Sequence, residues 1–135
     1  MKYIAYCRKS TDEKDKQVLS IEAQIAELTE FAKREKLEIA QFITEAKTAK
    51  APGRQKFAEV LHLLETGAAQ GIISWHPDRL ARNSIDGGKI IYFLDIGKIV
   101  NLKFPSFWFE NTPQGKFMLN IAFGQSKYYV DNLSE

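Results

Sequence analysis

The segment with the most chemical character is residues 75–82, which read WHPDRLAR. It follows the apolar stretch 71–75, which predicts a buried strand, so its charges arrive at the carboxyl end of a strand, the usual ligand position in an open α/β sheet. If the segment is helical, Arg79 and Arg82 share one face, and two guanidinium groups on one face suit a phosphate. Surface arginines paired with nearby aspartates, including Asp86, are the competing interpretation.

A serine follows the first apolar segment of the chain. Residues 2–8 read KYIAYCR and predict a strand, and Arg8 and Ser10 stand two apart, so in an extended chain they point the same way. A serine hydroxyl is a weak nucleophile at neutral pH and needs a base or nearby cations. Neither His62 nor His76 stands in the pattern of a hydrolase triad. The residues therefore predict a serine surrounded by arginines, which favour a phosphoryl centre over an acyl one.

Strand-like and helix-like segments alternate along the chain and predict an α/β domain. Strands are expected over 2–8, 37–44, 71–75 and 99–104. Helices are expected over about 20–36, with Ser20 as N-cap, over 57–64 with Gly67 at the end, over 85–94, and from 115 onward. Short connections indicate a mostly parallel sheet of four to five strands covered by helices on both faces, which makes three layers, with a long C-terminal helix.

Composition limits the function classes. The chain has 135 residues, a net charge of +2 and a pI near 8.6, a balance too mild to predict nucleic-acid binding by itself. The single cysteine, Cys7, forms no internal disulfide or zinc site and is expected to be a small buried apolar residue. No apolar run approaches the ~18 residues of a membrane span, and the first residues are too short for a signal peptide, so we expect a soluble cytoplasmic protein.

Two further segments have more than one interpretation. Residues 45–53 read EAKTAKAPG and predict a mobile polar loop closed by a Pro-Gly turn. The aromatic run at 107–109, FWF, could stack on bases, but in a chain of this size it favours a core or an interface.

Four motifs, in order along the chain, resemble the catalytic domain of the serine recombinases, the resolvase/invertase family. They are YCRKS at 6–10, SIEAQ at 20–24 followed by Leu28, GR at 53–54 opening a helix, and DRLAR at 78–82. The spacing from Ser10 to Gln24 and the SIEAQ run look more like the large integrases and serine transposases than the small resolvases. The resemblance implies a resolvase-like fold.

The resemblance also implies roles for single residues. It implies that Ser10 attacks the DNA phosphodiester, becomes linked to the 5′-phosphate and releases a 3′-hydroxyl. The arginines that match the phosphate clamp of the family are Arg8, Arg54, Arg79 and Arg82. Asp78 matches an acid that orients an arginine or assists proton transfer. The supporting positions are Tyr6, Gln24, Glu45, which stands where the family often has aspartate, and Thr48, which stands where many members have serine.

No cofactor or metal is implied, because several guanidinium groups can supply the charge neutralisation that other phosphoryl-transfer enzymes obtain from Mg²⁺. The implied partners are double-stranded DNA and further copies of the chain, as a homodimer that assembles to a tetramer during strand exchange. The implied division is a catalytic domain at 1–114 and the start of a long oligomerisation helix at 115–135. The chain then is a fragment whose DNA-recognition region follows it.

Two departures from the family pattern concern other positions. The terminal helix of the family often opens with an Ala-x-x-Glu-Arg segment, whereas 124–128 read GQSKY, which leaves the interface details open. The position of a lysine that some small resolvases carry falls in an apolar stretch near Leu63, so no catalytic lysine is assigned.

Two other function classes remain as alternatives. A recombinase-like fold could serve as a non-catalytic module for self-association or regulation, although such a module has no need of the serine and all four arginines. A nucleotide-binding α/β domain is the second alternative, but the chain lacks both Gly-x-Gly-x-x-Gly and the phosphate-binding Gly-x-x-x-x-Gly-Lys-Ser/Thr loop.

Overall fold

The structure, a computed structural model, describes residues 1–10 and 19–133, and side chains up to 124. Its strands are β1 (Lys2–Arg8), β2 (Glu38–Glu45), β3 (Gly71–Ile73) and β4 (Asn101–Lys103). Its helices are α1 (Ile21–Glu35), α2 (Gln55–Glu65), α3 (Pro77–Leu80), α4 (Ser84–Asp95) and α5 (Pro113–Leu133). None of these helices is long and apolar enough to cross a membrane.

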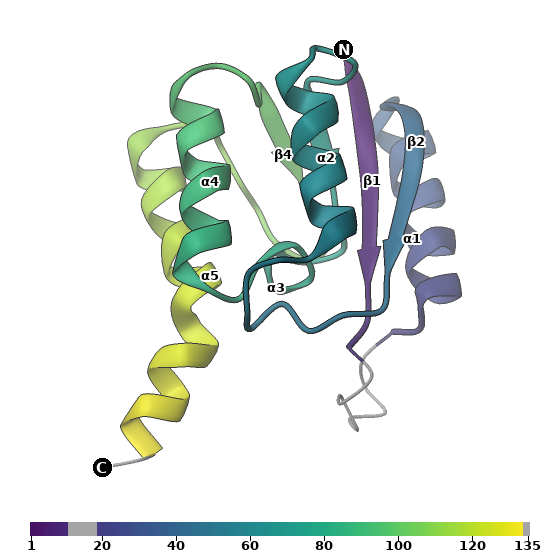
Figure 1. The fold of residues 1–135 in the computed structure, drawn as a ribbon. Helices are drawn as coiled ribbons and strands as arrows, with labels where there is room; N and C mark the ends of the chain where they lie inside the picture. The colour runs from purple at the N-terminus through teal and green to yellow at the C-terminus, as the bar shows by residue number, and fades with distance from the viewer. Residues whose placement is uncertain (11–18, 134–135) are drawn as a thin grey trace.

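The strands form one parallel sheet in the order β2-β1-β3-β4. Helices α2, α4 and α5 cover one face and α1 covers the other (Figure 1). The predicted α/β fold with a parallel sheet between helical layers is therefore confirmed, with four strands in the described part of the chain. Because β1 lies between β2 and β3, its carboxyl end meets the carboxyl ends of both neighbours, where the polar motifs follow.

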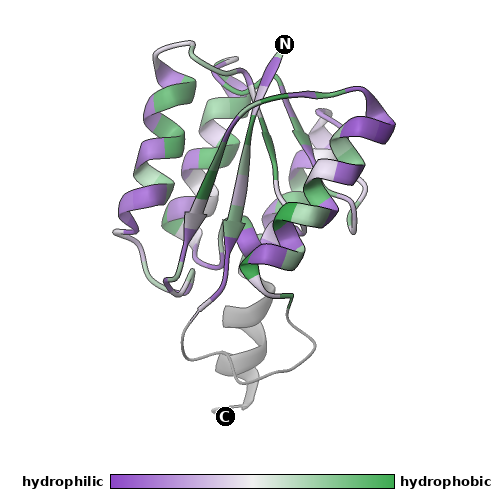
Figure 2. Ribbon diagram, turned by 90° about the vertical axis from the view of Figure 1, so that its right-hand side faces the viewer, coloured by the Kyte–Doolittle hydropathy of each residue, from purple (hydrophilic) through white to green (hydrophobic). Residues whose placement is uncertain are grey.

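Side chains of β1 alternate between the two helical layers. Ile4 and Tyr6 pack in the cluster formed with α2, α4 and α5, whereas Tyr3, Ala5 and Cys7 pack against α1. Figure 2 shows the apolar residues of the helices turned toward the sheet. Cys7 is fully buried, and burial raises the pKa of its thiol to about 12, so it is the small buried apolar residue that the sequence predicts.

Helix boundaries follow the capping signals in the sequence. The Ser20 side chain accepts a hydrogen bond from the Ala23 amide at the start of α1, and Lys36 ends the helix in the left-handed conformation with φ of 58°. Gly67, with φ of 84°, follows the end of α2 and is the glycine predicted there. The predicted extents of both helices are confirmed to within about two residues.

The aromatic run at 107–109 divides between core and surface. Phe109 is 7% exposed and belongs to the larger apolar cluster, whereas Trp108 is 78% exposed.

Helix α5 has one buried and one exposed set of apolar side chains. Leu119 and Phe123 are buried against the domain, while other apolar side chains of the helix are exposed. The last turns of α5 run past the body of the domain (Figure 1).

Candidate active site

Arg8 ends β1 and is fully buried, which is unusual for an arginine. Its guanidinium donates three hydrogen bonds to backbone carbonyls: Nε to Arg79 at 3.0 Å, Nη1 to Lys47 at 3.0 Å and Nη2 to Asp78 at 2.7 Å. Arg8 therefore joins the loop after β2 to the segment after β3. In this conformation it is a structural cross-link at the carboxyl edge of the sheet.

Gln24 of α1 holds the backbone at the end of β1. Its Oε1 accepts from the Arg8 amide at 3.2 Å, and its Nε2 donates to the Arg8 carbonyl at 2.9 Å and to the Leu19 carbonyl at 3.0 Å. The side chain is fully buried, so these bonds are protected from water. Gln24 thereby fixes the backbone two residues before Ser10.

Ser10 lies just beyond β1, at the carboxyl edge of the sheet, and is 3% exposed. The Lys9 amide donates to the Glu45 carbonyl at 3.1 Å, so pairing with β2 continues one residue past the strand. The serine is thus brought to the edge where the arginine-bearing segments converge.

Asp78 and Arg79 lie in α3, a single helical turn. The Arg79 Nε donates to Asp78 Oδ1 at 3.1 Å and its Nη1 donates to the Arg8 carbonyl at 3.3 Å, which brings the segment after β3 against the end of β1. Burial raises the pKa of Asp78, but the hydrogen bond from His76 and the positive charge of Arg79 outweigh it, and the net effect holds the pKa well below its usual range. Asp78 is therefore ionised at neutral pH.

Arg79 and Arg82 do not share a helical face, because the segment is helical only as far as Leu80. Helix α3 ends at Leu80, and Ala81 is extended with φ of −155°, so Arg82 lies outside the helix. The Arg82 amide donates to the Ala49 carbonyl at 3.1 Å in the loop before α2. Tertiary contacts of this connector, in which Leu80 and Ala81 are fully buried, replace further helical turns. Arg79 is 5% exposed, while Arg82 is partly exposed.

Arg54 precedes α2 and is also buried, at 4% exposed. Its Nη1 donates to the Tyr6 hydroxyl at 2.9 Å, and its Nη2 donates to the Leu80 carbonyl at 2.8 Å and to Asp86 Oδ2 at 3.1 Å. The guanidinium carbon lies 4.3 Å from the centre of the Phe57 ring, within range of a cation–π interaction. Among the residues that the structure describes, its Nε finds no hydrogen-bond partner.

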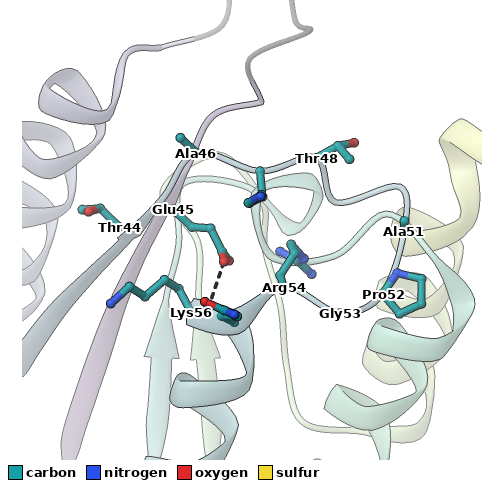
Figure 3. A pocket seen from close by; sticks show the side chains of 11 residues that line it. Thr44, Glu45, Ala46, Thr48, Ala51, Pro52, Gly53, Arg54 and Lys56 are labelled. Carbon is teal, nitrogen blue, oxygen red and sulfur yellow. Dashed lines mark hydrogen bonds between the residues drawn. The ribbon is translucent and has the colours of Figure 1, made fainter.

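Glu45 ends β2 and caps the amino terminus of α2. Its carboxylate accepts from the amides of Lys56 at 2.9 Å and Phe57 at 3.2 Å, a role that the Arg54 side chain does not fill (Figure 3). The same carboxylate accepts from the Tyr6 hydroxyl at 2.5 Å. Burial raises the pKa of Tyr6 far above its usual range, so the phenol stays protonated and donates to Glu45.

Thr48 lies in the loop between β2 and α2, and its Oγ1 accepts from the Lys50 amide at 3.2 Å. This loop, together with the end of β2 and the start of α2, lines a cavity of about 590 Å³ (Figure 3). The basic residues that line the cavity are Lys47, Arg54 and Lys56. A basic cavity therefore adjoins the carboxyl edge of the sheet.

Sequence reasoning missed Asn83, and it named Asp86 only as a possible partner of surface arginines, whereas Asp86 is 1% exposed. Asn83 is the N-cap of α4: its Oδ1 accepts from the Asp86 amide at 2.8 Å, and its Nδ2 donates to Asp86 Oδ2 at 2.9 Å and to the Ala49 carbonyl at 3.0 Å. An asparagine three residues before an acidic residue at a helix start resembles a capping box, and that signal could have identified the pair.

The site as a whole brings the predicted residues to one edge of the sheet. Arg8, Arg79 and Asp78 contact one another directly, and Tyr6, Glu45 and Arg54 form an adjoining buried network. Within residues 1–10 and 19–133, no three His, Cys, Asp or Glu side chains gather as a metal site would require. Ser10 follows the end of β1 at this edge, and the buried guanidinium groups of Arg8 and Arg79 lie at the same strand end.

Comparisons with known proteins identify the family of the chain and the solved structures that share its fold. A family model described as "Resolvase, N terminal domain" matches residues 3–135. No curated protein sequence matches the chain.

Solved structures share the fold. The N-terminal catalytic domain of TP901-1 integrase has a TM-score of 0.70 and 20% identity, with 97% of this chain and 98% of that chain covered. A resolvase family site-specific recombinase from Streptococcus pneumoniae has a TM-score of 0.64 and 20% identity, with 99% and 91% covered. The C-terminal catalytic domain of ISC1926 TnpA, an IS607-like serine recombinase, has a TM-score of 0.65 and 16% identity, with 80% and 72% covered.

Proposed function

This chain belongs to the resolvase N-terminal domain family of serine recombinases, and from that premise we propose that it cleaves and rejoins DNA strands. In the proposed reaction the Ser10 oxygen bonds to a backbone phosphorus while the bond from phosphorus to the 3′-oxygen breaks. The net reaction transfers one proton from the serine hydroxyl to the departing 3′-oxygen, which leaves as a hydroxyl, and the 5′-phosphate stays on Ser10. Rejoining is the reverse attack by a 3′-hydroxyl, because the phosphoserine ester retains the reactivity of the broken bond.

The observation that carries the proposal is the contact between Arg79 and the Arg8 carbonyl, 3.3 Å from Nη1 to oxygen. It places a guanidinium beside the backbone two residues before the serine. Arginines bind phosphate oxygens with paired donors and stabilise the charge that develops as the phosphoryl group is attacked. The proposed roles are Ser10 as nucleophile, Arg8, Arg54, Arg79 and Arg82 as the phosphate clamp, and Asp78 as the residue that orients Arg79.

The arginines of this clamp are mostly closed off in the structure. Arg8, Arg54 and Arg79 are at most 5% exposed, so a DNA phosphate cannot contact their guanidinium groups without a rearrangement. We propose that assembly with further copies, a dimer and then a tetramer, produces the open site. The apolar side chains that α5 exposes support this step: Phe117 at 65%, Met118 at 55% and Ile121 at 48%.

The proposed division of labour follows from the same premise. We assign residues 1–114 to the catalytic domain and residues 115–135 to the start of the oligomerisation helix, and we assign no DNA-recognition role to these residues. The likeness to an integrase domain supports the large recombinase type.

A non-catalytic module is the second candidate, and the buried state of Arg8 favours it. An arginine that donates three hydrogen bonds to backbone carbonyls is what a purely structural role requires. In that case the domain would keep the recombinase fold for self-association only.

The two candidates differ in one covalent product. DNA-bound protein, expressed from its complete natural reading frame, is isolated from expressing cells and digested with nuclease and protease. We expect the peptide with Ser10 to carry a residual nucleotide by mass spectrometry, which needs no knowledge of the target sequence. Ser10→Ala removes the nucleophile and should abolish the adduct, whereas Ser84→Ala, at an exposed serine of α4, should retain it. An adduct that persists in Ser10→Ala contradicts the assignment, and its absence from the native protein favours the non-catalytic module.

A further inference from the structure

Arg54 and Asp86 form an ion pair inside the protein. The distance from Nη2 to Oδ2 is 3.1 Å, and each side chain is 2% exposed. A phosphate of a DNA duplex cannot enter the protein interior. If Arg54 acts on DNA, its guanidinium must therefore first leave this position.

Asp86 supplies the charge that holds the guanidinium inside. Glu45 reaches Arg54 through the Tyr6 hydroxyl, whereas Asp86 contacts it directly. A buried ion pair that loses one partner leaves an uncompensated charge, which is strongly unfavourable. A neutral residue at 86 would thus expel Arg54 toward solvent or toward an external anion.

The inner position satisfies Arg54 incompletely. Its Nε is buried and has no hydrogen-bond partner in the described part of the chain, which carries a free-energy cost. A phosphate can accept paired hydrogen bonds from an arginine and can therefore compete for the guanidinium. The inner position thus holds the Arg54 guanidinium, but a competing phosphate can displace it.

Asn83 makes departure of the guanidinium less costly for Asp86. Its Nδ2 donates to the same Oδ2 that accepts from Arg54, so the carboxylate keeps a donor when Arg54 leaves. The same Nδ2 also donates to the Ala49 carbonyl in the loop that precedes Arg54. The pair is therefore coupled to the segment that would move.

We propose that Asp86 is a positioning residue that holds the Arg54 guanidinium inside the protein until the site assembles on DNA, and that Asn83 eases the release by remaining as a donor to Asp86. This role rests on the proposed function, since DNA phosphate is the competing anion. It makes the Arg54 position a control on cleavage, separate from the chemistry at Ser10.

The first test labels arginines with a dicarbonyl reagent, p-hydroxyphenylglyoxal, and measures each site by mass spectrometry. In the native chain Arg54 should react much more slowly than Arg34, which is exposed on α1. In Asp86→Asn the rate at Arg54 should rise by roughly tenfold or more relative to Arg34, because the counter-charge is gone. Arg8 and Arg79 should stay protected, since backbone carbonyls hold them.

Asn83→Ala is the matched control, because it removes a hydrogen-bond donor to the Asp86 carboxylate and keeps the negative charge of Asp86. Arg54 should stay protected in that variant. Equal labelling of Arg54 in Asn83→Ala and Asp86→Asn, or no rise in Asp86→Asn, overturns the proposal. If Asp86→Asn does not fold, adding Arg54→Met should restore folding, because that change removes the unpaired cation; failure of this rescue also overturns it.

The second test measures the covalent adduct at Ser10. Asp86→Asn should form it several times faster than the native protein, and slower formation would show that Asp86 is needed at the phosphate, which overturns the holding role. Arg54→Ala should lose the adduct in either background. Absence of an adduct from the native protein contradicts the proposed function, whereas the labelling rates alone decide whether Asp86 holds Arg54.

Discussion

Arg8 provides the sharpest test of how the site is built, because the structure gives it a mechanical role in addition to its proposed catalytic one. Substitution by Met keeps much of the volume of the side chain and removes the guanidinium that makes the three hydrogen bonds to backbone carbonyls. The carbonyls of Arg79, Lys47 and Asp78 then lose their bonds to the guanidinium at 2.7–3.0 Å. The loop after β2 and the segment after β3 would no longer be joined through the end of β1.

The expected loss of stability follows from these bonds. A hydrogen bond that involves a charged group contributes about 1.5–3 kcal/mol, so three give an upper range of roughly 4.5–9 kcal/mol. Removing the desolvation cost of a buried cation offsets part of this loss. We therefore expect Arg8→Met to lower the free energy of unfolding by about 3–5 kcal/mol, a large share of the ~5–15 kcal/mol of a typical domain.

Urea unfolding of residues 1–135, followed by far-ultraviolet circular dichroism, measures this change. Arg34→Met is the matched control, because Arg34 is exposed on α1 and should change stability by less than about 0.5 kcal/mol. Arg8→Lys should recover only part of the loss, since one ammonium cannot reproduce the planar set of donors. A loss below about 1 kcal/mol in Arg8→Met would refute the cross-linking role.

The acidic residues of the site give two further predictions. The pKa of Asp78 is held below its usual range, so its carboxylate stabilises the folded state above pH ~4, and this contribution is lost as pH falls through the depressed pKa. Asp78→Asn should therefore flatten the pH dependence of the free energy of unfolding below pH ~4. The same pH dependence in Asp78→Asn and the native protein would contradict the pairing with Arg79. Glu45→Gln should cost about 1–2 kcal/mol in urea unfolding, because an amide offers fewer acceptors to Tyr6 and to the start of α2, whereas Glu59→Gln on the exposed side of α2 should be nearly neutral.

Local signals in the sequence predicted the elements well where caps and periodicity act over a few residues. Ser20 and Gly67 mark real helix ends, and the alternation in β1 divides its side chains between two helical layers. Residues 79–82 do not form one helical face. The helix ends after a single turn, and the following connector is held by a hydrogen bond to the Ala49 carbonyl of another loop. Propensity over four residues cannot anticipate such a contact.

Burial of the charged residues is the part that no local pattern could predict. The partners of the Arg8 guanidinium include carbonyls 70 and 71 residues away, and Arg54 and Asp86 are 32 residues apart. Spacing along the chain shows that arginines gather near a strand end, but only the folded chain decides whether they face an anion or a carbonyl. The exposure of each arginine is therefore a property of the tertiary structure, whereas the motif alone predicts the chemistry.

Different partners hold the buried arginines, and this difference orders the steps that precede cleavage. Arg8 is held by carbonyls of two segments, so freeing it requires those segments to separate. Arg54 is held by one carboxylate, one carbonyl and one hydroxyl, and it can leave by rotation of its own side chain once an anion competes. If cleavage occurs as proposed, Arg54 is the clamp residue that can respond first to DNA, and Arg8 responds only when the segments around it rearrange.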